Sequence, residues 1–212
     1  MITISAYKWV PPFAQGQVRD LRARWACEEA GIPYKSKLIG FEDQSTPQYR
    51  AWQPFGQVPA MEDDGIVMFE SGAIVLHIGE KSEALLPRDA QGRARAITWL
   101  FCALNTIEVV IGQYGDLYFH QKEAWVKERE PQLVQAVQKR LKELAAALGG
   151  KDYLEGRFTI GDLMMSTVFR ILDDHPQFLN AEPTLAAYKK RCEARPAFQR
   201  ALAAQLNDFE KR

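Results

Sequence analysis

The chain has 212 residues, which exceeds one average domain and falls short of two large ones, so two small domains or one mixed domain are both open. Its 27 acidic and 27 basic residues balance, which argues against a nucleic acid or an anionic membrane as partner, since both attract basic proteins. Residues 1–5 lack the basic segment and apolar core of a signal peptide, and no apolar run approaches about 18 residues. We expect a soluble, cytoplasmic protein.

The cysteines and histidines show no metal-binding pattern. Cys27, Cys102 and Cys192 are too far apart for a zinc motif and lie in segments that look helical, so we expect reduced, buried thiols. None of the three histidines has a partner at ligand spacing, and we expect no metal site. These histidines are His77, His120 and His175.

The first 52 residues predict a strand, a loop, a helix, a second strand and a polar connector. Their expected limits are Ile2–Ala6, Tyr7–Gly16, Gln17–Ala30, Tyr34–Ile39 and Phe41–Trp52. Val18, Leu21 and Trp25 indicate the helix by their three- and four-residue spacing, and Gly31 gives its stop. Pro47 suits the first turn of a short helix within the connector.

The stretch from Gln53 to Gly72 is rich in turn residues and polar pairs. A turn and a short apolar strand stopped by Pro59 come first, and a hairpin turn at Asp64 and Gly65 leads to a second strand, Ile66–Phe69. An apolar helix follows, expected over Ser71–Lys81. The order β-α-β-(α)-β-β-α predicts a small mixed sheet with helices, in which the first βαβ unit is parallel and right-handed.

Glu70 and Ser71 stand directly before that apolar helix. The free backbone N–H groups and the positive dipole end of a helix beginning there favour an anion beside Ser71. The Glu70 carboxylate can hold a cation. A ligand that carries both an ammonium and a carboxylate, such as the free end of an amino acid, would fit this pair.

Beyond Lys81 the pattern changes to helices, and we find no convincing strand. A proline-containing linker precedes a long helix, about Gln91–Tyr118, and a second amphipathic helix begins near Pro131 and ends at Gly149. The apolar face of the long helix comprises Ile97, Leu100, Phe101, Leu104, Ile107 and Ile111. Leu163–Leu172 is apolar nearly all round, as in a helix at the centre of a bundle, and two helices follow at 184–194 and 197–209.

Thr159 and Asp162 form a capping box at the start of the central helix. The Thr159 hydroxyl can accept from the N–H of Asp162 while the Asp162 carboxylate accepts from the N–H of Thr159. Phe158 can pack on Leu163 as a hydrophobic staple. We interpret this motif as a folding signal without a catalytic role.

In this order, Gln57-Val58-Pro59, Glu70-Ser71, Leu85-Leu86-Pro87 and the Thr-x-x-Asp box resemble the pattern of cytosolic glutathione S-transferases over essentially the whole chain. The resemblance implies an α/β, thioredoxin-like, glutathione-binding domain at 1–82, a linker at 83–90 and an all-α, all-helical domain at 91–212. It also implies a homodimer in which the α/β half of one subunit meets the α half of the other.

The resemblance implies a site for glutathione, the co-substrate of this family. The peptide bond between Val58 and Pro59 would be cis, and the N–H and C=O of Val58 would pair with the cysteinyl part of the tripeptide. Gln57 would contact the same tripeptide. Glu70 and Ser71 would hold its γ-glutamyl end, although Ser71 could also be a plain N-cap.

Activation of the thiol is where the chain departs from the family. A Tyr or Ser, sometimes replaced by Cys, at or after the end of the first strand lowers the thiol pKa in the family, yet residues 10–17 contain none of these types. Tyr7 has the right donor, but it could equally be an aromatic packed under the loop. Gln15 and Gln17 could donate amide hydrogen bonds or be solvated, and backbone N–H groups at the helix start could contribute.

The resemblance places the second substrate between the halves. Candidates for its pocket are Trp9, Phe13, Asn105, Glu108 and Tyr114, with Tyr118 as an alternative to Tyr114.

Three functions remain open from the sequence. The first is conjugation of glutathione to small, largely apolar electrophiles. The second is a non-catalytic binding or interaction module, which the missing hydroxyl favours. The third is a glutathione-dependent disulfide reductase or peroxidase, which needs no protein cysteine if glutathione supplies the sulfur.

Overall fold

The structure is a computed structural model that describes residues 1–209. It divides into two compact units: unit 1 contains Met1–Arg88 and the segment from Ala194 onward, and unit 2 contains Asp89–Glu193. The last helix, α10 (Pro196–Asp208), therefore belongs to unit 1, whereas the sequence placed it in a helical domain at 91–212. It packs on α1 (Asp20–Ala30), where the rings of Trp25 and Phe198 lie 4.8 Å apart.

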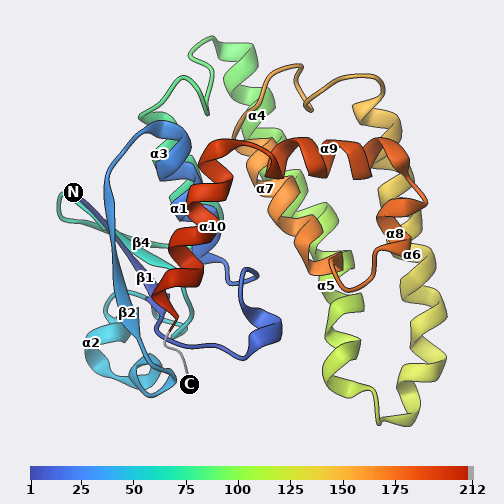
Figure 1. The fold of residues 1–212 in the computed structure, drawn as a ribbon, viewed down its shortest axis with the longest axis horizontal. Helices are drawn as coiled ribbons and strands as arrows, with labels where there is room; N and C mark the ends of the chain where they lie inside the picture. The colour runs from blue at the N-terminus through green and yellow to red at the C-terminus, as the bar shows by residue number, and fades with distance from the viewer. Residues whose placement is uncertain (210–212) are drawn as a thin grey trace. The chain divides into compact units, whose positions relative to one another are not determined.

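The sheet of unit 1 has the strand order β2-β1-β3-β4 (Figure 1). Its strands are β1 (Ile2–Tyr7), β2 (Tyr34–Ile39), β3 (Ala60–Asp63) and β4 (Ile66–Phe69). The pair β1 and β2 is parallel, as predicted, and the other pairs are antiparallel. The strand expected to stop at Pro59 instead begins after it, because a proline has no N–H for the ladder and is tolerated only before or at the edge of such a strand.

The helices of unit 1 begin close to the predicted positions, with one shift. They are the 3₁₀ turns Pro12–Ala14 and Phe41–Ser45, α1, α2 (Pro47–Arg50), α3 (Ser71–Glu80) and α10. The first helix was expected from Gln17, but α1 begins at Asp20 because the N–H groups of Leu21 and Arg22 first make shorter-range turn bonds. Pro47 occupies the first turn of α2, as predicted.

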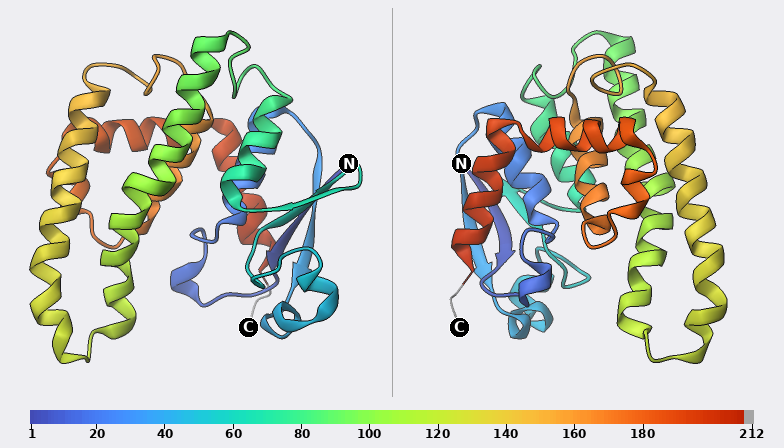
Figure 2. Two further views of the ribbon diagram at one scale, coloured as in Figure 1. Left: turned by 180° about the vertical axis from the view of Figure 1, so that it is seen from behind. Right: turned by 45° about the vertical axis from the view of Figure 1, so that its right-hand side comes forward.

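The two faces of strand β1 serve different parts of unit 1. Ile2, Ile4 and Ala6 are buried on one side, and α1 packs against both β1 and α3 (Figures 1 and 2). Because side chains alternate along a strand, Ser5 points to the other side, where it meets Tyr49 of α2. This second side carries the turn that leads into β3.

Unit 2 is entirely helical over its described residues. Its elements are α4 (Ala90–Cys102), a π-helical segment (Ala103–Glu108), α5 (Val109–Asp116), a 3₁₀ turn (Leu117–His120), α6 (Ala124–Leu148), α7 (Ile160–Phe169), a 3₁₀ turn (Arg170–Leu172), α8 (Gln177–Asn180) and α9 (Pro183–Glu193). Figure 2 shows α5 and α6 as the two arms of a hairpin. All ten residues of α7 are buried, which confirms its predicted central place.

Two details of unit 2 correct the sequence prediction. Helix α6 begins at Ala124, so Pro131 lies inside it rather than at its start. Phe101, assigned to the apolar face of the long helix, is 49% exposed, whereas Leu100 and Ile107 are buried. The buried residues nearest to Phe101 in the helix are Ala96, Leu100 and Ala103, so Phe101 lies at the edge of the buried face of the helix.

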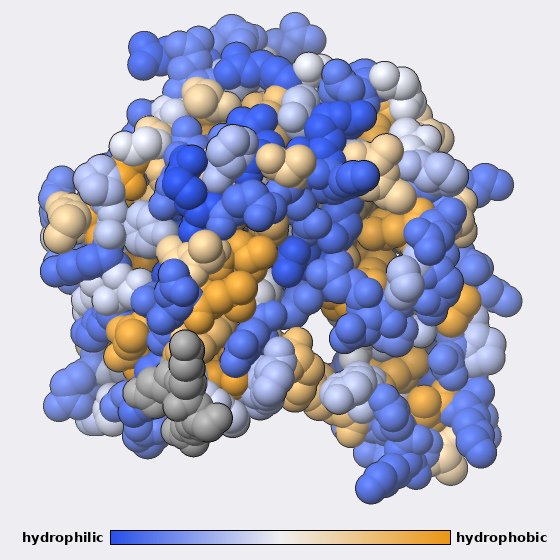
Figure 3. All heavy atoms as spheres, in the orientation of Figure 1, coloured by the Kyte–Doolittle hydropathy of each residue, from blue (hydrophilic) through white to orange (hydrophobic). Residues whose placement is uncertain are grey.

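The continuous helical segment Ala90–His120 is long and apolar enough to cross a membrane by length and composition. The sequence prediction had found no apolar run of this kind. The core helix of a soluble protein passes the same test; here 33% of the apolar window is buried, and Leu100, Ile107 and Ile111 are buried residues of the segment. Hydrophilic residues dominate the molecular face that Figure 3 shows, with hydrophobic residues in separate patches.

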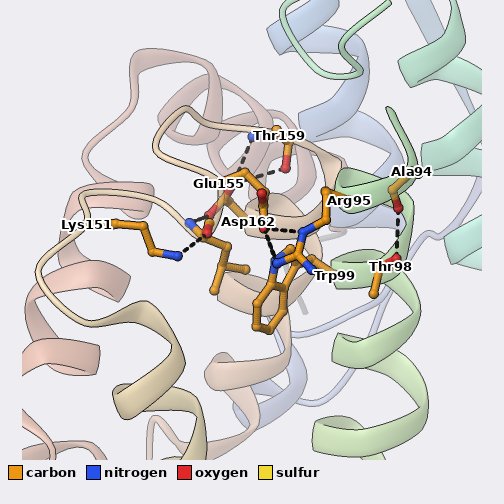
Figure 4. A network of polar contacts seen from close by, with 9 residues as sticks. Ala94, Arg95, Thr98, Trp99, Lys151, Glu155, Thr159 and Asp162 are labelled. Atoms are coloured by element: carbon orange, nitrogen blue, oxygen red, sulfur yellow. Dashed lines mark hydrogen bonds and ion pairs between the residues drawn. The ribbon is translucent and has the colours of Figure 1, made fainter. Parts of the chain in front are cut away.

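The start of α7 is held by a dense polar network (Figure 4). The Asp162 carboxylate accepts from the N–H of Thr159 at 2.9 Å, so the predicted capping box is confirmed, and the Thr159 hydroxyl also accepts from Gly161 at 3.2 Å. A Cβ on Gly161 would come within 2.6 Å of the Trp99 Cβ, so glycine permits the close approach of α7 to α4. In the same network, the indole N–H of Trp99 donates a hydrogen bond to the Glu155 carboxylate at 2.5 Å.

Candidate functional site

The turn before β3 presents an unpaired peptide group on each side of Val58. The Val58–Pro59 bond is cis, as the resemblance implied. Among residues 1–209, neither the N–H nor the C=O of Val58 makes a hydrogen bond. The neighbouring groups are paired, because the carbonyl of Gln57 and the N–H of Ala60 both bond to side chains. An extended peptide could therefore pair with Val58 in the manner of an added strand.

Ser5 and Tyr49, which the sequence analysis missed, hold both ends of that turn. The Tyr49 hydroxyl donates to the carbonyl of Gln57 at 2.6 Å, and the N–H of Ala60 donates to the Ser5 hydroxyl at 2.7 Å. The two hydroxyl oxygens lie 2.8 Å apart. Both side chains are buried, at 0% and 3% exposure.

Ser71 is the first residue of α3 and is held by a buried arginine. The Arg22 guanidinium, 3% exposed, donates to the Ser71 hydroxyl oxygen at 3.1 Å. Since a guanidinium can only donate, the hydroxyl hydrogen of Ser71 stays available for an acceptor. The first helical bond of α3 runs from the N–H of Ile74, so the N–H groups of Ser71 and Gly72 also make no hydrogen bond among the described residues.

Glu70 occupies the N-cap position of α3 with an exposed carboxylate. Its backbone has φ 68°, a left-handed conformation uncommon for a residue with a side chain, and its side chain caps no N–H of the helix. The alternative of Ser71 as N-cap therefore does not hold. A strained residue beside unpaired helix N–H groups is typical of ligand-binding positions. The arrangement offers one carboxylate and one set of donors for an amino-acid end.

Comparison with known families covers both units. The model of the glutathione S-transferase N-terminal domain matches residues 14–80, and the model of the glutathione S-transferase C-terminal domain matches residues 111–205. The chain belongs to the glutathione S-transferase family. The N-terminal match, residues 14–80, includes the turn at Val58 and the start of α3.

Individual glutathione S-transferase relatives cover nearly the whole chain. The Zea mays protein "Glutathione S-transferase 4" is 28% identical over 92% of this chain and 89% of its own length. The "Disulfide-bond oxidoreductase YfcG" of Escherichia coli is 29% identical over 85% of this chain and 89% of its own length. A crystal structure of a glutathione transferase family member from Pseudomonas fluorescens with two glutathione bound has a TM-score of 0.82, with 27% identity over 94% of this chain and 92% of that one.

Tyr7, the candidate for thiol activation, ends strand β1. Its hydroxyl oxygen accepts from the Gln44 amide at 2.6 Å, and its ring packs on Phe41 with centroids 5.0 Å apart. Because Gln44 donates, the Tyr7 hydrogen remains available to donate to another group. Burial, and then the charge of Asp20, raise the pKa of Tyr7, so the phenol stays protonated at neutral pH.

The start of α1 offers fewer free hydrogen-bond donors to stabilise a thiolate than the sequence suggested. Gln15 and Gln17 precede the helix, which begins at Asp20. The N–H groups of Leu21 and Arg22 already donate to carbonyls of the preceding turn. Asp20 is 1% exposed, and burial, which outweighs its ion pair with an arginine, raises the pKa of this carboxyl to about 6. At pH 7 most of its charge is present and opposes a second anion nearby.

The ion pair of Asp20 belongs to a buried cluster between α1 and α10. Arg24 donates to Asp20 at 2.7 Å and to Asp208 at 2.7 Å, and the Gln205 amide donates to Asp20 at 2.7 Å. Each of these residues except Asp208 is at most 1% exposed. The cluster fixes α10 on α1, which explains why the last helix belongs to unit 1.

The candidates for the second substrate have unlike environments within their own units. In unit 1, the Trp9 ring lies edge-on to Phe41 at 6.2 Å, and Phe13 is 52% exposed. In unit 2, Asn105 is exposed and Glu108 is 9% exposed, both on the π-helical segment. Tyr114 is 7% exposed and packs against the rings of His175 and Phe178.

The cysteines and histidines form no cluster suited to a metal ion in the described part of the chain. Residues 1–209 hold no group of three or more His, Cys, Asp or Glu side chains suited to a metal ion. All three cysteines are free thiols; Cys27 and Cys192 are buried as expected, while Cys102 is partly exposed. Burial raises the pKa of Cys27 to about 12, so it is not a thiolate at neutral pH.

Proposed function

We propose that this glutathione S-transferase family member conjugates the thiolate of glutathione to small, largely apolar electrophiles. The observation that carries the proposal is the arrangement in unit 1 of an unpaired Val58 peptide and an unpaired helix start at Ser71, flanked by the Glu70 carboxylate. Glutathione has an extended cysteinyl segment and a γ-glutamyl end with an ammonium and a carboxylate. Those groups match the donors and acceptors of the site.

In the proposed complex, the Val58 peptide pairs with the cysteinyl backbone. The Ser71 hydroxyl and the N–H groups at the start of α3 receive the γ-glutamyl carboxylate, and Glu70 receives the ammonium. Gln57, whose exposed side chain has no partner among the described residues, contacts the same tripeptide, and Pro59 shapes the turn.

The thiol is activated, in this proposal, by the hydroxyl of Tyr7. Removing the hydroxyl in Tyr7→Phe should raise the pKa of bound glutathione by roughly one unit, because a hydrogen bond to a charged acceptor contributes about 1.5 kcal/mol or more. Thiolate absorbance against pH measures this pKa. Tyr34→Phe, which removes a different partly buried hydroxyl of unit 1, is the matched control. An identical thiol pKa in wild type and Tyr7→Phe would remove Tyr7 from this role and leave Gln15 and Gln17 as the candidates.

For the second substrate we propose Trp9 and Phe13 of unit 1 and Asn105, Glu108 and Tyr114 of unit 2 as candidates. The exposed Phe13 is suited to an apolar electrophile. Tyr114 could take part only through its edge, since little of it is exposed.

Glutathione-dependent disulfide reduction is the second candidate function. It is favoured by the relatedness to the oxidoreductase YfcG and by the two glutathione molecules in the Pseudomonas fluorescens structure. In such a reaction a glutathione thiolate attacks a disulfide, forms a mixed disulfide and releases one thiolate. A second glutathione then releases the other thiolate as glutathione disulfide forms. No protein cysteine is required, which agrees with the absence of one from residues 10–17.

Product analysis distinguishes these functions. The protein is given glutathione with an aryl halide in one reaction and with a small dialkyl disulfide in another. We expect the thioether of glutathione to form above the uncatalysed rate in the first reaction. Catalysed glutathione disulfide in the second reaction alone would establish the reductase. If the protein accelerates neither reaction yet binds glutathione, the chain is a binding module.

We also propose that the protein is a cytoplasmic homodimer. Each unit exposes large apolar side chains that a partner could cover, and sedimentation should give a mass of about twice the 24.1 kDa chain. Examples are Phe55, Ile66 and Val67 in unit 1 and Phe101 and Val109 in unit 2. A stable monomer at micromolar concentration would contradict the proposal.

A further inference from the structure

We propose that Ser5 and Tyr49 are positioning residues for glutathione, because they set the orientation of the Val58 peptide that binds it. The inference rests on the proposed glutathione site. Neither residue touches the tripeptide in this account. They act through the backbone on both sides of Val58 and Pro59.

The hydrogen bonds of this pair can run in only one direction. The carbonyl of Gln57 can only accept, so the hydrogen of Tyr49 must point toward it. The Tyr49 oxygen then accepts from Ser5, whose own oxygen accepts from the N–H of Ala60. The positions of both hydroxyl hydrogens, on Tyr49 and on Ser5, are therefore assigned.

This series of hydrogen bonds closes a ring around the turn. It joins the carbonyl just before Val58 to the N–H just after Pro59 through three bonds of 2.6 to 2.8 Å. Rotation of either peptide plane, Gln57–Val58 or Pro59–Ala60, would break a hydrogen bond of this ring. The N–H and C=O of Val58 are the groups that the ring leaves unpaired, so it holds them in place before a ligand arrives.

The ring of hydrogen bonds is anchored on two secondary-structure elements of unit 1, β1 and α2. Ser5 lies in the middle of β1, between neighbours bonded to β2 and β3. Tyr49 lies in α2, which is capped by the Thr46 hydroxyl, and burial raises the pKa of Tyr49 to about 12. Tyr49 is thus a neutral donor at any physiological pH.

Tyr49→Phe keeps the aromatic side chain and its packing but removes the hydroxyl that links Ser5 to the Gln57 carbonyl. We expect the Kd for glutathione, measured by calorimetry, to rise roughly five- to tenfold, because the Val58 peptide must then be ordered by the ligand itself. The KM for glutathione should rise by a similar factor while kcat stays within about twofold, since no group at the sulfur changes. Ser5→Ala should have a similar effect and, in the double variant, add little to it.

Tyr34→Phe is the matched control, since burial also raises the pKa of Tyr34 to about 12 and this hydroxyl lies on β2, away from the turn. Both tyrosine variants should lose similar stability, yet only Tyr49→Phe should bind glutathione more weakly. If Tyr49→Phe fails to fold, Ser5→Ala provides the same test. If the wild type binds glutathione and folded Tyr49→Phe and Ser5→Ala bind it with the same Kd, this inference is wrong while the proposed function stands. Absence of binding by the wild type would overturn the proposed function itself.

Discussion

Ser71→Ala should raise the Kd for glutathione roughly tenfold or more. The hydroxyl held by Arg22 would lose its hydrogen bond to the γ-glutamyl carboxylate, and a hydrogen bond to a charged group contributes about 1.5 to 3 kcal/mol. Glu70→Gln removes only a charge and keeps the side-chain length at a position with φ 68°. The double variant should bind about 100-fold more weakly if the two contacts are independent.

Calorimetric titration with glutathione measures these changes. Asp64→Asn is the matched control, since Asp64 is also an acidic residue of unit 1 with a positive φ, 49°, and it lies on the hairpin turn between β3 and β4. Its Kd should equal that of the wild type. Unchanged affinity in both Ser71→Ala and Glu70→Gln would rule out the start of α3 as the γ-glutamyl site.

Asp162→Ala should lower the free energy of unfolding by roughly 3 to 5 kcal/mol. The carboxylate is fully buried and accepts four hydrogen bonds at 2.9 to 3.1 Å. Two of the donors belong to the capping box, one to the preceding loop and one to α9. Removing it leaves those donors buried without acceptors, and each unsatisfied group costs about 1 kcal/mol or more. The donors are Leu154 N–H, Thr159 N–H, Thr159 O–H and Tyr188 O–H.

Denaturant unfolding followed by circular dichroism measures this effect. Asp152→Ala in the same loop is the control, because its ion pair with Arg191 is exposed and such pairs contribute at most about 1 kcal/mol. Asp162→Asn should lie between the two, since an amide keeps one accepting oxygen. A loss below about 1 kcal/mol in Asp162→Ala would mean that the network in Figure 4 reorganises without this carboxylate.

Much of the fold follows from local patterns in the sequence. Asp64 and Gly65 place the hairpin turn, the apolar run of α7 places the central helix, and Thr159 with Asp162 marks where that helix starts. These features depend on residues near one another in the chain. The side of unit 1 on which α10 packs depends instead on the hydrogen bonds of Arg24 to Asp208 and of Gln205 to Asp20, which join residues 184 and 185 positions apart. No local sequence pattern predicts these contacts.

The residues of the candidate site also fall into those that local sequence predicts and those that depend on distant contacts. Val58, Glu70 and Ser71 could be predicted because a proline turn and a helix start have recognisable sequence signals. Ser5 and Tyr49 could not, because their role depends on a contact between a strand and a helix 44 residues apart. The tyrosine in the connector Phe41–Trp52 was one of three aromatic residues there, and nothing in the sequence singled it out.

Tyr7 shows the limit most clearly. The sequence left it as either a hydroxyl donor or a packed aromatic, and the structure shows both properties: its ring packs on Phe41 while Gln44 leaves its hydrogen available. In the proposed complex this hydrogen points to the sulfur of glutathione.

A crystal structure of the protein with glutathione tests the central claim most directly. The account predicts that the cysteinyl N–H and C=O pair with Val58, that the γ-glutamyl carboxylate lies within hydrogen-bond distance of Ser71, and that the sulfur faces the Tyr7 hydroxyl. Glutathione bound away from both Val58 and Ser71 would contradict it.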